Sequence, residues 1–349
     1  MSGDWKIKFV TDWGAIYSPE FQGKWLTWSE NAVDGHVFFH PVLCMAWLET
    51  YRPLRKLDPL FCIAENETGT LFLPLVIWHR NWKNAFQKLI VPVGYSDFDY
   101  HEPYRFGAND KFEWESVLSC ILKRISETFS FDFLEINGIL TEMTGDGWSK
   151  EEQVAPFCDL TSFRSIEQYL QSLRASLRGD IRRQMRRIEE AGPIRLFEYR
   201  NISDALCVLP HFLELHRKRW PRAYKAPGFH ENLLKYGLET GIVHFSALKA
   251  GDELLSYELG FKFSGVYYYY MPAIEPRFEN LSPGKIHLYK LVEYAINNSF
   301  RIFDHLRGEE NYKASWTKQV KSLYKFIFKA DRAVSKCRNK LVSLKTAFS

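Results

Sequence analysis

The chain has 349 residues, 46% of them hydrophobic and 16% aromatic, so it can bury a large core and is long enough for two domains. Its net charge of +4 is too small to indicate a nucleic-acid partner, and six scattered cysteines without C-x-x-C spacing give no indication of a metal site or a disulfide framework. The longest strongly apolar run, at 71–78, is too short to span a bilayer, and the first residues lack the apolar core of a signal peptide. We therefore expect a cytoplasmic protein without a membrane span.

Apolar alternation and apolar spacing of 3.6 residues divide the first half into strands and two helices. In chain order these are a strand at 5–10, a helix at 41–51, strands at 60–64, 70–79 and 88–93, a helix at 112–125 and a strand at 131–136. A polar, glycine-bearing stretch at 141–156 follows and indicates a domain boundary. We expect an N-terminal domain of residues 1–155 and a C-terminal domain of residues 156–349.

A long basic helix opens the second half. Ser165 and Gln168 form a capping box, which predicts that the helix begins there. One face carries the apolar residues Leu170, Leu173, Leu177, Ile181, Met185 and Ile188. The opposite face carries Arg174, Arg178, Arg182, Arg183, Arg186 and Arg187. Such a face is either solvated or a binding site for phosphate or an acidic polymer.

The remaining elements repeat the order of the first half. They are a strand at 194–199, helices at 205–220 and 231–240, strands at 243–248, 254–261 and 266–271, a helix from 282, strands at 303–306 and 323–328, and a helix at 333–346. Both halves show a hairpin, a third strand, a loop, an amphipathic helix and a short strand in that order. We interpret this as a diverged internal duplication. It predicts an α/β (α+β) fold of two similar domains, each a mixed twisted sheet flanked by helices.

The start of the helix at 282 has the features of an anion site. Ser282 is expected to be the N-cap, and Pro283 suits the first helical position because its missing N–H has no partner there. Gly284 would let the backbone approach a ligand closely, and Lys285 adds a cation. Unsatisfied N–H groups at such a helix end favour a phosphate, although an ordinary capped helix explains the same residues.

This helix start and the segments after it resemble a known family. Pro283-Gly284, the strand Phe303–Leu306 and the stretch Arg307–Trp316 are similar to the pattern S-P-G, then F-D-F-x-x-G-D/E-x-x-Y-K-x-x-W, of the bacterial CelD-like acetyltransferases. That family belongs to the GNAT acyl-CoA transferase superfamily and is linked to cellulose and exopolysaccharide synthesis. The resemblance implies two tandem GNAT-like domains, a layout that the Fem-type transferases share. The chain departs from the pattern at His305, where the family has an aromatic or apolar residue.

Asp304 is the preferred candidate for the general base. It sits in a strand that should be buried on both faces, where burial raises the pKa of a carboxylate unless it is paired. Arg307 and Lys313 are close enough in sequence to pair with it, so a structural ion pair is the alternative interpretation. Glu309 and Glu310, which we expect at the mouth of the crevice, are further candidates for the base.

The resemblance implies further roles. Acetyl-CoA would be the acyl donor, with its pyrophosphate at Ser282, Gly284 and Lys285 and its thioester carbonyl against the backbone at Tyr270 and Met271. Tyr312 stands where many GNAT enzymes place the tyrosine that protonates the thiolate, and packing of its ring is the alternative role.

The acceptor side is expected in both halves of the chain. A loop with Asp97, Tyr100 and His101 resembles an Asp-aromatic loop that faces the cleft between domains in the family, and its mixed polar and aromatic groups suit a sugar. A polar surface loop explains the same residues. Arg307, Lys313 and Trp316 are the other candidates for substrate binding.

These observations predict an acyl-CoA-dependent N- or O-acetyltransferase that acts on a sugar, a nucleotide-sugar or a polysaccharide precursor, without a metal. One alternative is a Fem-type transferase that uses aminoacyl-tRNA, for which the arginine face would have to bind the nucleic acid. The other alternative is a non-catalytic module that binds glycans or assembles a complex on a degenerate GNAT fold.

Overall fold

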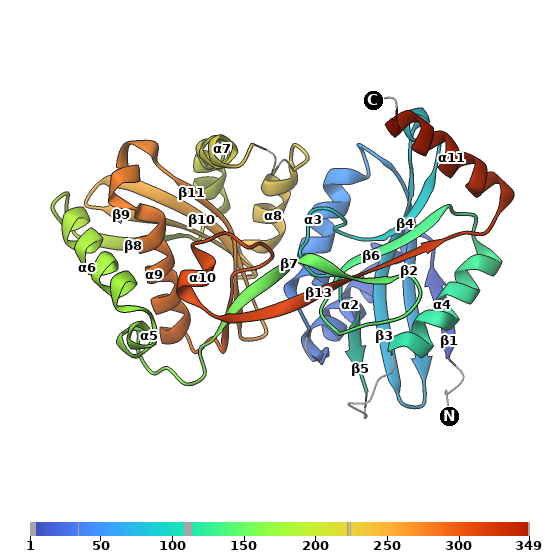
Figure 1. The fold of residues 1–349 in the computed structure, drawn as a ribbon, viewed down its shortest axis with the longest axis horizontal. Coiled ribbons are helices and arrows are strands. Elements are labelled where there is room, and N and C mark those ends of the chain that lie inside the picture. Colours follow the sequence, from blue (N-terminus) through green and yellow to red (C-terminus); the bar gives the residue numbers. More distant parts are fainter. Residues whose placement is uncertain (1–4, 34, 108–113, 222, 224, 348–349) are drawn as a thin grey trace. The chain divides into compact units, whose positions relative to one another are not determined.

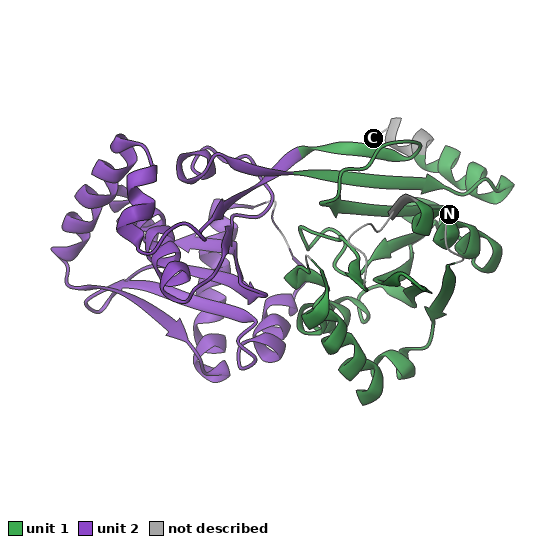
Figure 2. Cartoon of the chain, turned by 90° about the horizontal axis from the view of Figure 1, so that it is seen from below, with its two compact units in different colours: residues 1–152, 322–349 green, residues 153–321 purple. Residues whose placement is uncertain are grey.

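A computed structural model describes residues 5–33, 35–107, 114–221, 223 and 225–347. The chain forms two compact units, each with a mixed sheet flanked by helices, which confirms the predicted α/β class (Figure 1). Unit 1 comprises residues 1–152 and 322–349, and unit 2 comprises residues 153–321 (Figure 2).

The sheet of unit 1 has the strand order β1-β2-β3-β4-β6-β13, with β5 also paired to β3. The strands are β1 (Lys6–Val10), β2 (Lys56–Asn66), β3 (Gly69–His79), β4 (Lys88–Pro92), β5 (Tyr104–Phe106), β6 (Phe133–Ile139) and β13 (Gln319–Lys329). Neighbouring strands are antiparallel except for β4 and β6, which are parallel. The helices of the unit are α1 (Trp13–Ile16), α2 (Pro19–Asn31), η1 (Val37–Phe39), α3 (Pro41–Tyr51), η2 (Trp82–Asn84), α4 (Trp114–Thr128) and α11 (Ala333–Ala347).

Aromatic side chains build the core of unit 1 on one face of its sheet. Ser18 caps α2 by accepting a hydrogen bond from the Phe21 backbone N–H, and Pro19 takes the first helical position. The helix then places Trp25 against Phe61 and Phe72, with ring centroids 5.2 and 5.5 Å apart. Edge-to-face contacts of this kind add to the burial of apolar area and fix the position of the helix on the sheet.

The sheet of unit 2 has the order β7-β12-β11-β10-β9-β8. The strands are β7 (Trp148–Asp159), β8 (Ile194–Tyr199), β9 (Val243–Ala250), β10 (Glu253–Phe263), β11 (Val266–Ile274) and β12 (Ile302–Asp304). Of the pairs in this part of the sheet, β11 and β12 are parallel and the others are antiparallel. The helices are α5 (Ile166–Ser172), α6 (Ala175–Glu189), α7 (Ile202–Arg219), α8 (Phe229–Gly237), η3 (Pro276–Leu281), α9 (Pro283–Asn297) and α10 (Lys313–Trp316).

Two helical layers enclose the sheet of unit 2 (Figure 1). Ile181 and Ile188 of α6 and Ile286 and Leu291 of α9 belong to one core cluster with Tyr267 and Phe303 of the sheet. On the other face, Phe212 of α7 packs against Phe245 and Tyr257. The predicted apolar stripe of the basic helix therefore does face the core.

The predicted duplication appears in the topology of the two units. Each sheet is a run of antiparallel strands, then a parallel pair (β4 with β6, β11 with β12), then a sixth, antiparallel strand. The sixth strand comes from the other half of the sequence in both cases. β7 follows β6 in the chain but pairs with β12, and β13 follows β12 but pairs with β6.

Several sequence predictions differ from the structure. The polar stretch at 141–156 contains most of β7, because its polar residues occupy a strand with many exposed positions. The basic helix breaks after α5, where Leu173 has extended backbone angles, and resumes as α6. Residues 322–349 group with unit 1 through the pairing of β13 with β6, whereas we expected them in the C-terminal domain. The predicted start of α4 at residue 112 lies outside the described residues.

Candidate active site

The strands β11 and β12 pair over only three residues and then part. Their last paired residues are Tyr268 and Asp304, while β11 continues to Ile274. Next to this point β11 carries a β-bulge: Leu259 pairs with Met271 and Phe261 with Tyr268, so Tyr269 and Tyr270 together oppose Gly260. Bulges of this kind occur beside active sites because they redirect backbone groups and side chains. The predicted donor residues Tyr270 and Met271 lie at the bulge and directly after it.

A buried carboxylate faces this bulge. Glu258 is fully buried, and its carboxylate accepts hydrogen bonds from the Tyr267 hydroxyl at 2.7 Å and from the Tyr270 backbone N–H at 3.4 Å. Burial raises the pKa of Glu258 to about 8, and the two hydrogen bonds limit the increase. A Cβ at Gly260 would lie 2.6 Å from a carboxylate oxygen of Glu258, so this position has room only for glycine. The sequence analysis did not identify Glu258.

Glu258 belongs to a chain of titratable groups. The Tyr267 hydroxyl that donates to Glu258 lies 2.8 Å from Nδ1 of His244. Nε2 of His244 in turn lies 4.0 Å from a carboxylate oxygen of Glu198, which is partly exposed. Burial lowers the pKa of His244 to about 3, so this imidazole is neutral near pH 7.

The start of α9 differs from the predicted N-cap. Ser282 adopts left-handed backbone angles (φ 51°, ψ 50°), and its side chain makes no capping hydrogen bond. Pro283 occupies the first turn as predicted. A Cβ on Gly284 would lie 2.8 Å from Cδ1 of Ile274, so glycine is needed for the helix to approach the end of β11. Lys285 forms an ion pair with Asp180 of α6.

The arginine face of α6 lies next to this helix start. Arg187 donates a hydrogen bond of 3.1 Å to the carbonyl oxygen of Asn280, just before α9, and Arg183 pairs with Asp180. Arg178 instead donates to the carbonyl oxygen of Leu173 at the break before α6. Part of the predicted basic face is therefore used to hold helices together, while Arg182 and Arg186 are exposed.

Asp304 lies where the two strands part and is fully buried. One carboxylate oxygen accepts the backbone N–H of Leu306 at 2.8 Å, and the other lies 2.8 Å from Nζ of Lys321. Leu306 has a φ of 60°, which is costly for a branched side chain, so this hydrogen bond holds a strained turn. The sequence suggested Lys313 as a partner, but Lys321, near the start of β13, pairs with Asp304, and Lys313 pairs with Glu310.

The loop after β12 brings Tyr312 close to the bulge. Burial raises the pKa of the Tyr312 hydroxyl, and the charges of Glu310 and Glu258 raise it further. Burial also raises the pKa of Tyr269, and the charge of Tyr312 adds to that increase. Tyr312 is still 36% exposed and precedes the short helix α10. Glu309 is exposed in the same loop, as expected.

Residues 175–314 match the model of a family described as an acetyltransferase (GNAT) domain. This stretch is a GNAT-type acetyltransferase domain. No curated protein sequence matches the chain in a similar comparison.

Solved structures that resemble the whole chain include a tandem GNAT protein. FemX has a TM-score of 0.62 at 10% identity, with 97% of this chain and 99% of that chain covered. A tandem GNAT protein from the clavulanic acid biosynthesis pathway has a TM-score of 0.51 at 11% identity, covering 95% and 100%. L-PGS from Bacillus licheniformis has a TM-score of 0.51 at 12% identity, covering 87% and 96%. At these identities the similarity establishes the fold alone.

Other predicted site residues of unit 2 have structural contacts. Lys313 is buried, and its ammonium donates to the carbonyl oxygen of Arg307 at 2.8 Å and pairs with Glu310. Trp316 is buried, and its ring lies parallel to that of Tyr169 with centroids 6.5 Å apart.

His305 is fully buried behind the loop. Burial and the Lys313 charge lower its pKa to about 3, so it is a neutral core residue. Its Nε2 lies 3.6 Å from Sγ of Cys158, and its ring contacts that of Phe303. This explains why an imidazole is tolerated where the CelD-like pattern has an aromatic or apolar residue.

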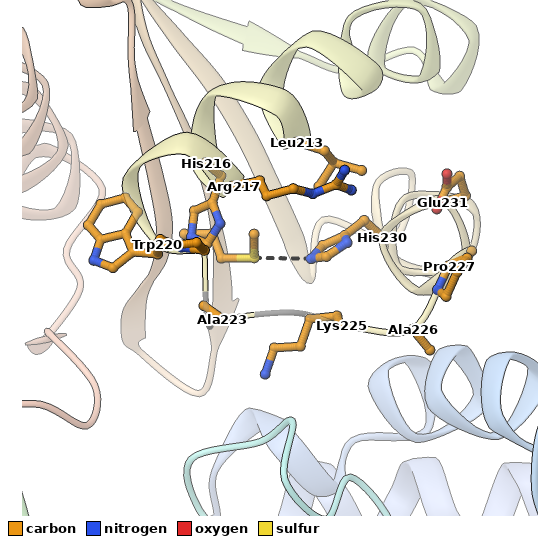
Figure 3. Close-up of a pocket in the computed structure, with 13 residues that line it drawn as sticks. Leu213, His216, Arg217, Trp220, Ala223, Lys225, Ala226, Pro227, His230 and Glu231 are labelled. Carbon is orange, nitrogen blue, oxygen red and sulfur yellow. Dashed lines mark hydrogen bonds between the residues drawn. The ribbon is translucent and has the colours of Figure 1, made fainter.

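A pocket of about 230 Å³ lies beside Met271 in the GNAT domain (Figure 3). Its lining comes from the end of α7, the stretch after it and the start of α8, and includes His216, Trp220, His230 and Glu231. Nε2 of His230 lies 3.1 Å from Sδ of Met271. Burial, together with the Lys225 charge, lowers the pKa of His216 to about 4 and that of His230 to about 3.

The pocket has one polar group without a partner. Oε2 of Glu231 is buried and makes no hydrogen bond to any of the described residues. Arg217 and Lys225 also line the pocket, so it offers both an acceptor and cations to a polar ligand. The sequence analysis identified only Met271 among these residues.

The predicted acceptor loop of unit 1 is buried. Asp97 accepts a hydrogen bond from Nε1 of Trp47 at 2.8 Å, and Nδ1 of His101 lies 3.0 Å from the carbonyl oxygen of Asn137. Tyr100 packs its ring against Phe38 with centroids 5.5 Å apart. These residues therefore have packing roles within unit 1, whatever further role they have toward a substrate.

We expect Asp97→Ala to lower the free energy of unfolding by about 1–3 kcal/mol, because it removes the acceptor of the buried Trp47 indole N–H. Asp97→Asn is the matched control, since its amide oxygen can still accept this hydrogen bond. Urea unfolding of the two variants measures the effect. Equal stability of the Ala and Asn variants would contradict this role.

No three His, Cys, Asp or Glu side chains come together as a metal-binding group within the described ranges. Among the helices described there, none is both long and apolar enough to cross a membrane.

Proposed function

We propose that the GNAT domain transfers an acetyl group from acetyl-CoA to an amine or hydroxyl. The observation that carries this proposal is the parting of β11 and β12 after Tyr268 and Asp304, with the bulge at Tyr269 and Tyr270 beside it. Backbone groups at a parted strand can hydrogen-bond a thioester carbonyl as it gains negative charge. The match of residues 175–314 to an acetyltransferase family supports the same reaction.

The proposed donor site extends from the bulge to the start of α9. The thioester lies against the backbone at Tyr270 and Met271, and the pyrophosphate lies at the first turn of α9, at Ser282 and Gly284. Lys285 supports this role through its charge, although its ion pair with Asp180 offsets part of it. The N–H groups of the first helical turn supply the remaining attraction for an anion.

The transfer needs one proton removed and one supplied. The acceptor nitrogen or oxygen bonds to the acetyl carbon, the carbon–sulfur bond breaks, and the acceptor loses a proton. We propose Glu258 as the group that takes this proton, because its raised pKa of about 8 makes the carboxylate, once ionised, a stronger base than an ordinary Glu side chain. Tyr312 donates a proton to the departing thiolate. Asp304 positions the loop that carries Tyr312, and Glu309, exposed in that loop, is a further candidate for the base.

The proposed acceptor is a sugar, a nucleotide-sugar or a polysaccharide precursor, as in the CelD-like family. The pocket at Met271 supports this, since an indole ring, a buried carboxylate oxygen and two cations suit the apolar face and polar groups of a substituted sugar. Arg307, Lys313 and Trp316 remain proposed contacts to the acceptor.

A second candidate function is transfer from aminoacyl-tRNA. The exposed arginines of α6, Arg182 and Arg186, favour it, and FemX shares the fold. Calorimetry of the purified protein with acetyl-CoA, free CoA and tRNA distinguishes these functions. Binding of acetyl-CoA supports the first, and salt-dependent binding of tRNA alone supports the second. Binding of neither supports a non-catalytic module.

We expect Gly284→Ala to weaken binding of acetyl-CoA by about tenfold in an Ile274→Val background. The Ile274→Val change removes the Cδ1 atom that a new Cβ would contact at 2.8 Å and leaves a contact with Cγ1 at 3.3 Å, which a shift of a few tenths of an ångström relieves. The methyl group then lies beside the N–H groups of the first turn and hinders the approach of the pyrophosphate. Ile274→Val alone is the matched control. Unchanged affinity in the double variant, with an unchanged melting temperature, would remove the donor site from the start of α9.

A further inference from the structure

Unit 1 contains an open pocket of about 650 Å³ that the transfer reaction does not use. The turn before β2, the end of β3, the segment around η2, the start of β4 and α11 form its walls. Five of its lining residues are cations, and none is acidic: Arg55, Lys56, Arg80, Lys88 and Arg338. The whole chain has a net charge of only +4, so this concentration of positive charge is local.

The strand register forces part of this charge together. Lys56 of β2 pairs with His79 of β3, and His79 pairs with Lys88 of β4. Directly opposite residues on adjacent strands project to the same face, so three basic side chains form one row across the sheet. Like charges in such a row repel one another. Asp58 is hydrogen-bonded to His79 at 2.5 Å, but neither lysine has an acidic partner among the residues that the structure describes.

Two guanidinium groups are fixed beside this row. The guanidinium carbons of Arg55 and Arg80 lie 4.4 and 4.5 Å from the ring centroid of Trp78. Arg80 also donates a hydrogen bond of 2.6 Å to the side-chain oxygen of Asn84, and Arg55 lies over the ring of Tyr51. Arg55 has no carboxylate partner within the described part of the chain. Both guanidinium groups are therefore held at the Trp78 ring by neutral groups, and an anion at the pocket would offset the repulsion between their charges.

The rim of the pocket is apolar. Leu54 and Phe86 line it and are 59% and 63% exposed, and Trp82 of the adjoining η2 is 62% exposed. Exposed side chains of this size beside a cationic pocket suit a ligand in which an apolar or aromatic group adjoins the anion.

We propose that this pocket of unit 1 binds a phosphate ester, with the phosphate between Arg55, Arg80 and Lys88 and the attached apolar group on Trp78 and Phe86. Planar guanidinium forks match phosphate oxygens in a bidentate geometry, which favours a phosphate over a simple halide. Phosphate esters of this chemistry occur both as free metabolites and as lipid headgroups. The site is separate from the donor and acceptor sites proposed for the GNAT domain, and it does not depend on them.

The test uses the full-length protein and two kinds of probe. Calorimetry with phenyl phosphate measures binding of a soluble ester, with phenol as the uncharged comparison. Cosedimentation with vesicles of phosphatidylglycerol, against vesicles of phosphatidylcholine, measures binding of a lipid phosphate. Binding of phenyl phosphate but not phenol identifies a soluble ester as the ligand, and binding of phosphatidylglycerol vesicles alone identifies a lipid headgroup.

We expect Arg55→Gln to weaken whichever binding is observed by about tenfold, because it removes a charged donor to the phosphate. Arg52→Gln is the matched control, since Arg52 also lies over an aromatic ring, that of Trp13, but does not line the pocket. Lys56→Gln, at an exposed position of the same row, provides a second variant if Arg55→Gln reduces the melting temperature. Binding of neither probe, or equal binding by the Arg55 and Arg52 variants, overturns the proposal.

Discussion

Asp304→Asn is expected to lower the free energy of unfolding by about 3 kcal/mol, the low end of the cost of breaking a buried ion pair. Asp304 is fully buried, and the side chain of its partner Lys321 is 27% exposed. The amide retains an oxygen for the Leu306 backbone N–H, so the loss comes from the ion pair. Because Lys321 can still reach water, the penalty stays below that of a fully buried cation.

A double-mutant cycle separates the pair from its surroundings. Lys321→Met removes the cation, so Asp304→Asn in that background should cost less than it does alone. Asp304→Ala should cost a further amount of about 1–3 kcal/mol, because the buried N–H of Leu306 then loses its acceptor. Thermal or urea unfolding measures all four variants.

The same variant distinguishes a positioning role from a catalytic one. If Asp304 positions the loop, Asp304→Asn reduces stability and reduces turnover only in part. A melting temperature equal to that of the wild type, together with complete loss of acetyl transfer, would show instead that Asp304 is the general base that the sequence suggested.

The order of the elements could be predicted because each has its own periodic signal. Strands such as Ile194–Tyr199 and the helix Pro41–Tyr51 follow the boundaries expected from alternation and from proline at the first helical turn. β7 was missed because its polar residues at exposed positions look like a loop. The exchange of β7 and β13 between the two sheets was also beyond sequence reasoning, because strand pairing depends on long-range contacts and leaves no local pattern.

Residues of the candidate site could be proposed from the sequence where their position in a motif suggests a role, and these roles stay predictions. Tyr312 does approach the bulge, and Gly284 does permit a close approach, although the group that approaches is Ile274. The partner of Asp304 was missed because Lys321 belongs to the next strand and not to the motif. The sequence does contain a signal for Glu258, a single carboxylate within the apolar strand Leu254–Phe261, followed two positions later by Gly260.

The buried carboxylate should make the stability of the protein depend on pH. The pKa of Glu258 is raised from 4.5 to about 8 by burial, so the folded protein holds this proton more tightly than the unfolded chain. The contribution of Glu258 to the free energy of unfolding is therefore at its full value below about pH 4.5, and it decreases as the pH rises toward 8. With 1.36 kcal/mol per pKa unit, the loss over this interval is roughly 4–5 kcal/mol at most.

Glu258→Gln should remove this dependence, because the amide is neutral at every pH and can keep the contact with the Tyr267 hydroxyl. The quantity to measure is the difference in unfolding free energy between wild type and variant from pH 5 to pH 9, in which the contributions of His216, His230 and His244 cancel. Glu253→Gln is the control, since Glu253 lies on the same strand with its side chain 44% exposed. If Glu258 also accepts the substrate proton, the limb of the kcat profile near pH 8 disappears in the variant. A difference that stays constant across this range would show that Glu258 is ionised in the folded protein throughout. The stability effect would then be wrong, and so would the raised pKa from which its role as a base is argued.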